Sequence, residues 1–198
     1  MAKTEVIDDN QSRIETCQGQ RMASAFSHIA VPALLFASFK SDSVNFKLFL
    51  LAAICSVIPD VDVVAFKFGI PYESQWGHRG FTHSLVFALC LASLLTYFHL
   101  QLRSKPWIVF WLCFVSCASH AILDAMTNGG LGVALYWPFS LERIFLPFRP
   151  IQVSPIGVSS FFTEWGFRVI VSELIWVLFP ALVIGIIGAA LRRKYEKS

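Results

Sequence analysis

Histidines and aspartates recur inside or beside the apolar segments of this chain, where ionisable side chains are costly and usually face a protein interior. Seven of them are candidate metal ligands or neighbours of a metal site: His28, Asp60, Asp62, His78, His83, His120 and Asp124. His120 and Asp124 stand four residues apart, so on a helix both project from one face and can share an ion. Imidazole nitrogen with carboxylate oxygen suits zinc, manganese or iron. Because a catalytic zinc takes about three protein ligands, seven candidates predict two divalent ions, with zinc the first choice.

The segment from His78 to His83 places two imidazoles around a glycine-containing turn, with Arg79 between them. A guanidinium is a planar fork that binds phosphate or carboxylate through two nitrogens. Arg79 is therefore predicted to meet an anion, either a substrate phosphoryl group or a carboxylate such as Asp62. We assign Arg79 and Asp62 to catalysis and the other six to metal binding. Thr82 and Thr127 are predicted to orient ligands through hydrogen bonds.

The elements that carry these residues have the composition of membrane helices. A helix that spans a bilayer takes about 20 mostly apolar residues. Four stretches meet or nearly meet this length: Met22 to Phe39, Ser84 to Leu102, Pro106 to Leu123 and Val169 to Leu191. A fifth, Leu48 to Ile58, stops at Pro59 before Val63 to Phe66 resumes it. Proline removes a helical hydrogen bond, so we predict a second membrane helix that is broken at Pro59.

Alternation of helix direction then brings the polar residues together. Candidate ligands lie near the start of the first and third predicted helices and near the end of the second and fourth. An up-and-down bundle puts these four points on one side of the membrane. The predicted fold is therefore an all-α, multi-pass bundle of about five membrane helices with a metal site near one face.

Composition bounds the remaining possibilities. Of the 198 residues, 56% are hydrophobic and 15% are charged, against about 25% charged in a soluble domain. The net charge of +3 resides in residues 192–198, so no basic stripe remains for a nucleic-acid partner. We predict a polar N-terminal segment (1–21), one membrane domain (22–191) and a basic tail (192–198). The aromatic-rich stretch Thr127 to Arg168 is predicted to be a loop with short interfacial helices.

The motifs resemble those of the YdjM-like family of membrane-bound metal-dependent hydrolases. The resemblance covers roughly residues 22 to 150 and is carried by the following residues: His28, Pro59-Asp60-Val61-Asp62, His78-Arg79-Gly80-Phe81-Thr82-His83-Ser84, Ser119-His120, Leu123-Asp124, Thr127 and Trp137-Pro138. It implies metal-dependent hydrolysis at the inner membrane of a bacterium. The spacing of His120 and Asp124 is also similar to that in zinc-dependent phospholipases C, which suggests a phosphoester substrate.

Several functions are compatible with such a cluster. The first is a hydrolase acting on a membrane lipid or a lipid-linked phosphoester. The alternative is a metal or proton transporter that uses the same residues as a relay. An intramembrane metalloprotease lacks support because the H-E-x-x-H signature is absent, and a purely structural assembly protein has no need for so many ligands. Eight lysine and arginine residues are expected on each side of the membrane, so their number does not decide the orientation. The basic tail favours a cytoplasmic C-terminus and a periplasmic metal face.

Overall fold

The computed structural model describes residues 21–22, 25–38, 43–155 and 162–195, and their regular structure is almost entirely helical. The α-helices are Ala25–Ser38 (α2), Phe46–Cys55 (α3), Leu85–Thr96 (α4), Pro106–Ala125 (α5), Glu164–Glu173 (α6) and Phe179–Tyr195 (α7). Shorter helical turns are Ile58–Phe68 (η1), Phe81–His83 (η2) and Leu174–Leu178 (η4). Two-residue strands, Arg21–Met22 (β1) and Ser154–Pro155 (β2), pair antiparallel. The predicted all-α class is confirmed.

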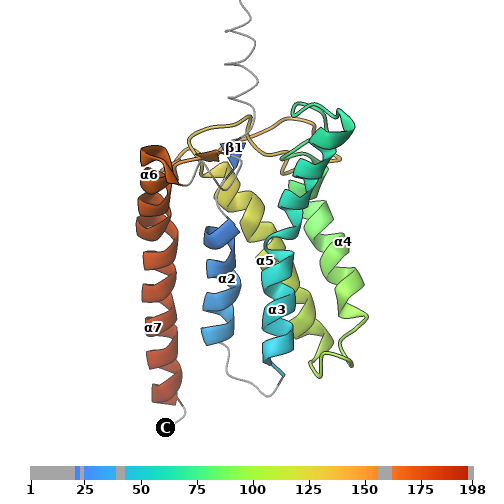
Figure 1. Cartoon of the computed structure of the whole chain (residues 1–198). Helices are drawn as coiled ribbons and strands as arrows, with labels where there is room; N and C mark the ends of the chain where they lie inside the picture. The colour runs from blue at the N-terminus through green and yellow to red at the C-terminus, as the bar shows by residue number, and fades with distance from the viewer. Residues whose placement is uncertain (1–20, 23–24, 39–42, 156–161, 196–198) are drawn as a thin grey trace, which may run out of the picture.

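Helix α5 is the centre of the bundle. Its apolar and small residues pack against α2, α3 and α4, and α7 lies on the far side of α2 (Figure 1). The core around Leu48, Ala92, Val109 and Cys113 is apolar and fills the half of the bundle away from the long loops. The other end of α5 carries His120 and Asp124, so the ionisable side chains of this helix lie at one end.

The break predicted at Pro59 is present. The side chain of Asn45 accepts a hydrogen bond from Leu48 N at the start of α3, which ends at Cys55. The tighter η1 begins at Ile58 with Pro59 in its first turn, and the two axes differ by 40°. Gly69 ends η1 in the left-handed region (φ 74°). This change of path turns Asp60 and Asp62 toward the bundle interior, where both are buried.

Fewer helices are long enough to cross a membrane than the sequence predicts. Two helices, Pro106–Ala125 and Glu164–Gly188, are long and apolar enough to span, and the bent pair α3 and η1 makes a third if it is one span. Helices α2 and α4 are apolar but shorter, so the count of five is not confirmed. The last span begins at Glu164, earlier than predicted, because the Thr163 side chain caps its first turn.

The stretch after α5 begins with the predicted loop. Its described residues 127–155 form turns, strand β2 and two isolated bridges, Thr127 with Ile151 and Val133 with Ile144, and contain none of the short interfacial helices that were expected. At the end of the stretch, residues 164–168 belong to α6. Arg143 anchors the loop by donating hydrogen bonds to the backbone carbonyls of His78 and Tyr72 on the facing loop. These two carbonyls therefore have partners without a helix. Apart from Arg21, the predicted N-terminal segment lies outside the described residues. The last three residues of the tail also lie outside them.

Candidate metal centre

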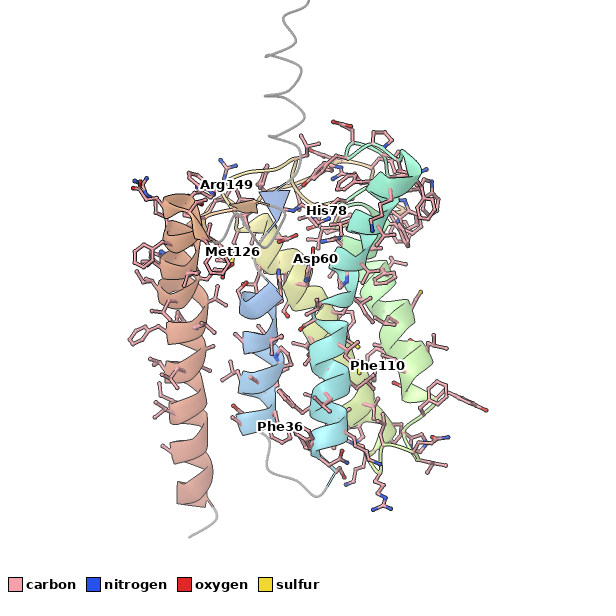
Figure 2. All side chains as sticks on the ribbon, viewed as in Figure 1. Phe36, Asp60, His78, Phe110, Met126 and Arg149 are labelled. Carbon is pink, nitrogen blue, oxygen red and sulfur yellow. The ribbon has the colours of Figure 1, made fainter. Side chains whose placement is uncertain are left out.

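Three elements deliver four polar side chains to the loop end of the bundle. Asp60 comes from η1, His83 from η2, and His120 and Asp124 from the last turns of α5. Figure 2 shows Asp60 and His78 at this end, whereas the labelled Phe110 lies in the apolar half. The convergence predicted from alternating helix direction is therefore seen for these four residues.

Four potential ligand atoms face one another at distances that suit a bound ion. His120 Nε2 lies 3.3 Å from Asp60 Oδ1 and 3.8 Å from Asp124 Oδ2. His83 Nε2 lies 3.7 Å and 3.3 Å from the same two oxygens. The two Nε2 atoms are 3.0 Å apart. Ligands held about 2.0–2.1 Å from a tetrahedral zinc are about 3.3 Å from each other, so the donor set fits a single divalent ion.

Hydrogen bonds on the outer side of each imidazole fix which nitrogen faces the centre. His120 Nδ1 lies 2.7 Å from the Ser56 carbonyl oxygen, which can only accept, so Nδ1 carries the proton. His83 Nδ1 lies 3.2 Å from Asp62 Oδ2 and 3.0 Å from the Thr82 hydroxyl, which itself donates to Asp62. When both rings are neutral, each therefore directs a bare Nε2 at the other, beside two carboxylates. Such an arrangement could hold a metal cation at the centre.

Asp62 belongs to the layer behind the ligands. Its Oδ1 accepts from His78 Nδ1 at 2.6 Å, and its Oδ2 accepts from the Thr82 hydroxyl at 2.6 Å and from the Arg79 backbone amide at 3.2 Å. Asp62, His78 and His83 could also form a three-ligand group. However, the Asp62 oxygens already contact the Nδ1 atoms of His78 and His83, so we interpret Asp62 as the residue that orients His83. His78 Nε2 is buried without a hydrogen-bond partner among the described residues.

His28 adjoins the four-ligand group without joining it. Its ring stacks on that of His120 with the centroids 3.7 Å apart, and its Nε2 lies 3.8 Å from Asp124 Oδ1. Both ring nitrogens of His28 and both Asp124 oxygens are buried without hydrogen-bond partners in the described part of the chain. Asp124 can thus offer Oδ2 to the four-ligand group and Oδ1 to a position beside His28.

Arg79 is completely buried and meets a different carboxylate from the one suggested by the sequence. Its Nε lies 3.0 Å from Asp124 Oδ2. Its Nη1 donates to the Thr127 hydroxyl at 3.1 Å and to the Gly129 carbonyl at 3.0 Å. Only the backbone amide of Arg79 reaches Asp62. Two of the three guanidinium nitrogens are therefore directed at the protein, and the fork is not free to grip a substrate through two of them.

Comparison with known proteins agrees with a membrane protein. The family model described as YdjM inner membrane protein matches residues 22–195. The chain belongs to the YdjM family. It is also 40% identical over 164 residues to the inner membrane protein YbcI of Escherichia coli (strain K12), covering 82% of this chain and 95% of that protein. No solved structure matches the chain.

The YdjM match also includes the loops that surround the candidate metal centre, where sequence reasoning overlooked two residues. Arg143 Nη2 donates to the Tyr72 carbonyl at 2.8 Å and the Ser74 carbonyl at 3.0 Å, and Nη1 donates to the His78 carbonyl at 2.8 Å. Partial burial lowers the pKa of Arg143 below its usual value. This clamp joins the 141–145 loop to the segment that leads into Arg79.

Tyr72 is the second overlooked residue. Its ring packs against that of His78 with the centroids 5.3 Å apart, and its side chain lies among charged groups of the site. Burial raises the pKa of Tyr72 above its usual 10, although nearby Arg79 opposes the shift. A lone tyrosine after Pro71 carries no sequence signal, so only the three-dimensional arrangement relates it to the metal centre.

Proposed function

We propose that this YdjM family protein is a membrane-bound metal-dependent hydrolase of a lipid or lipid-linked phosphoester. The observation that carries the proposal is the pair of Nε2 atoms, 3.0 Å apart, flanked by Asp60 and Asp124. A divalent ion at such a site lowers the pKa of a bound water and polarises a phosphoryl oxygen. Two neutral histidines and two carboxylates suit zinc first, with manganese or iron as alternatives.

The chain's own residues supply the support for that chemistry. Asp62 and the Ser56 carbonyl hold the two imidazoles with Nε2 inward. Arg79 balances the charge of Asp124 through an ion-pair contact with its Oδ2. His28 and the second oxygen of Asp124 offer a position for a second ion, which has fewer protein ligands than the first. We therefore propose that the second ion binds together with substrate.

An apolar groove supports a substrate with a lipid tail. It has a volume of about 360 Å³, lies between α2 and the α3–η1 pair, and is lined by Ile29, Leu50, Ala53, Ile54, Val57, Ile58 and Val61. Its upper residues flank Asp60, and Ile29 follows His28. The Asp60 side chain is 8% exposed, whereas those of His83, His120 and Asp124 are fully buried. An acyl or isoprenoid chain in this groove would bring its headgroup to the most accessible of the four ligands.

The groove and the core also favour a hydrolase over the alternative function, a metal or proton transporter. A transporter needs a polar route from the centre to the far face of the membrane. Beneath the ligands, the described core between α4 and α5 consists mainly of apolar residues such as Ala88, Ala92, Val109 and Leu112. Transport of a metal or proton through this packed region would require it to open.

We further propose that the shorter helices α2 and α4 also lie in the membrane, with the metal face periplasmic and the C-terminus cytoplasmic. This gives five membrane-embedded segments in a bacterial inner membrane. Glu73 is exposed on the loop next to the site. In a variant with Cys17 and Cys90 replaced by serine, Glu73→Cys should react with an impermeant thiol reagent in intact spheroplasts. Labelling only after lysis would reverse the orientation.

Metal content and turnover measured on one preparation test the function. Protein purified in mild detergent, wild type and His120→Ala, is analysed for bound metals and assayed with phosphatidic acid and p-nitrophenyl phosphate. We expect wild-type protein to hold metal and hydrolyse at least the lipid, and His120→Ala to lose both properties. Equal, negligible metal in the two proteins would refute the metal centre. Metal-replete wild type with no turnover but with metal uptake in proteoliposomes would favour the transporter.

A further inference from the structure

One nitrogen of Arg79 has neither a hydrogen-bond partner nor an ion-pair contact among the described residues. Nη1 donates to Thr127 and Gly129, and Nε faces Asp124. Nη2 is buried and has no hydrogen-bond partner among the described residues. The side chain is 0% exposed, so bulk water does not supply the missing acceptor. A buried charged donor in this state indicates a place for a ligand atom that accepts hydrogen bonds.

Tyr72 brings a second buried donor to the same place. The residue is 5% exposed, and its Oη has no hydrogen-bond partner in the part of the chain that the structure describes. Burial raises the pKa of Tyr72, so the hydroxyl keeps its proton and can donate. The backbone amide of Leu131 also lies close enough to favour negative charge at this oxygen.

Gly130 lets Arg79 and Tyr72 approach the 129–131 loop closely. It has φ 85°, and a Cβ built on it would lie 2.9 Å from Arg79 Nη1 and 3.0 Å from Tyr72 Oη. The guanidinium and the phenol therefore meet beneath this loop, and a larger residue would crowd both. Arg79 Nη2 can only donate, and the Tyr72 hydroxyl can donate as well as accept. An oxygen acceptor would therefore satisfy both groups, and the positive guanidinium favours an anionic one.

We propose that Tyr72 and Arg79 form an anion subsite that holds a non-bridging oxygen of a phosphoryl group beside Asp124. The inference rests on the proposed function for its substrate and adds Tyr72 as a binding residue. Arg79 contributes one nitrogen, Nη2, while its other nitrogens hold Asp124 and the 127–129 turn. The ligand is a phosphate monoester headgroup or the inorganic phosphate released from it.

The test compares Tyr72→Phe with wild type as full-length, metal-loaded protein in detergent. Calorimetric titration with inorganic phosphate measures the subsite directly, without turnover. Loss of one hydrogen bond to a charged group should weaken phosphate binding about 10- to 100-fold. Metal content and melting temperature should not change, because Tyr72 touches no proposed ligand through its hydroxyl. Tyr136→Phe, on the exposed part of the same loop region, is the matched control and should bind phosphate as wild type does.

Gly130→Ala provides a second variant, since its methyl group would crowd both Arg79 Nη1 and Tyr72 Oη. Gly132→Ala is its control, because Gly132 has a similar φ of 79° but faces the Ile144 backbone. We expect only Gly130→Ala to lose phosphate binding. Unchanged phosphate affinity in both Tyr72→Phe and Gly130→Ala would overturn the subsite.

Two further readouts separate this proposal from the hydrolase and identify the source of the phosphate. If wild type binds phosphate and Tyr72→Phe does not, the subsite stands even when no ester is hydrolysed. If phosphatidic acid is hydrolysed with the same KM by wild type and Tyr72→Phe, the hydrolase stands and the subsite fails. Competition of phosphatidic acid micelles with inorganic phosphate, lost in Tyr72→Phe, would assign the subsite to the lipid headgroup. Phosphate binding without such competition would assign it to free phosphate.

Discussion

Replacing Asp62 with asparagine should weaken metal binding without removing a ligand. The carboxylate accepts hydrogen bonds from His78, Thr82 and the Arg79 amide, and lies 3.2 Å from His83 Nδ1. Asparagine keeps the shape but turns one oxygen into an NH₂ group, which must then face a donor. Loss of an outer partner of a metal-bound histidine typically lowers metal affinity 10- to 100-fold. We therefore expect a loss of about 1.4 to 2.7 kcal/mol of zinc-binding free energy.

The assay is competition for zinc between purified protein and a chromophoric chelator. Asp60→Asn, which changes a proposed ligand, should lose more affinity than Asp62→Asn. Glu73→Gln removes an exposed carboxylate nearby and should leave zinc affinity unchanged. Zinc affinity equal to wild type in Asp62→Asn would refute the orienting role. A loss as large as that of Asp60→Asn would identify Asp62 as a ligand, as the alternative group with His78 and His83 requires.

Four further outcomes follow from the same contacts. Arg79→Lys should lower metal occupancy and cost about 1 to 3 kcal/mol of stability, because one ammonium cannot reach all the acceptors of the guanidinium. Metal analysis and thermal melting test this prediction, and wild-type values in both would show that the fold does not need Arg79. Arg143→Met should cost about 2 to 4 kcal/mol in unfolding experiments, since three carbonyls lose their donors. Ala53→Trp, which fills the groove beside Asp60, should slow hydrolysis of long-chain phosphatidic acid but not of p-nitrophenyl phosphate, whereas Ala37→Trp in the separate groove between α2 and α7 should alter neither. Elemental analysis should find one divalent ion per chain in phosphate-free protein and a second when phosphate is added; two ions in both states would contradict sequential binding.

The position of the site was predictable because it depends on few features of the sequence. Apolar runs fix the helices, Pro59 fixes the break, and alternating direction brings the ends of helices to one face. The spacing did not determine how the two carboxylates are oriented within the site. Asp60 and Asp62 are two residues apart, so their side chains leave a helix in different directions. Only the 40° change of path between α3 and η1 decides that Asp60 faces the imidazoles while Asp62 lies behind them.

The surroundings of the site depend on contacts that leave no local pattern. Arg143 joins segments some 65 to 71 positions apart by binding backbone carbonyls, which any residue type provides. Tyr72 and Gly130 meet only because the loop after α5 folds over the turn that holds Arg79. The partner of Arg79 was uncertain for the same reason. The sequence left open a substrate phosphoryl group or a carboxylate such as Asp62, whereas the left-handed backbone at Arg79 (φ 60°) accompanies a guanidinium directed at Asp124.

Charge balance explains why the resting centre suits one ion. The buried groups at the site include three carboxylates, Asp60, Asp62 and Asp124, and one guanidinium, Arg79. With neutral histidines their sum is −2, and burial of uncompensated charge is costly. One divalent cation between His83 and His120 cancels it. A second cation beside His28 would leave +2 in a buried site, unless a phosphate monoester dianion arrived with it. A phosphoryl group held by Arg79 and Tyr72 would bring this charge, which couples binding of the second ion to binding of substrate.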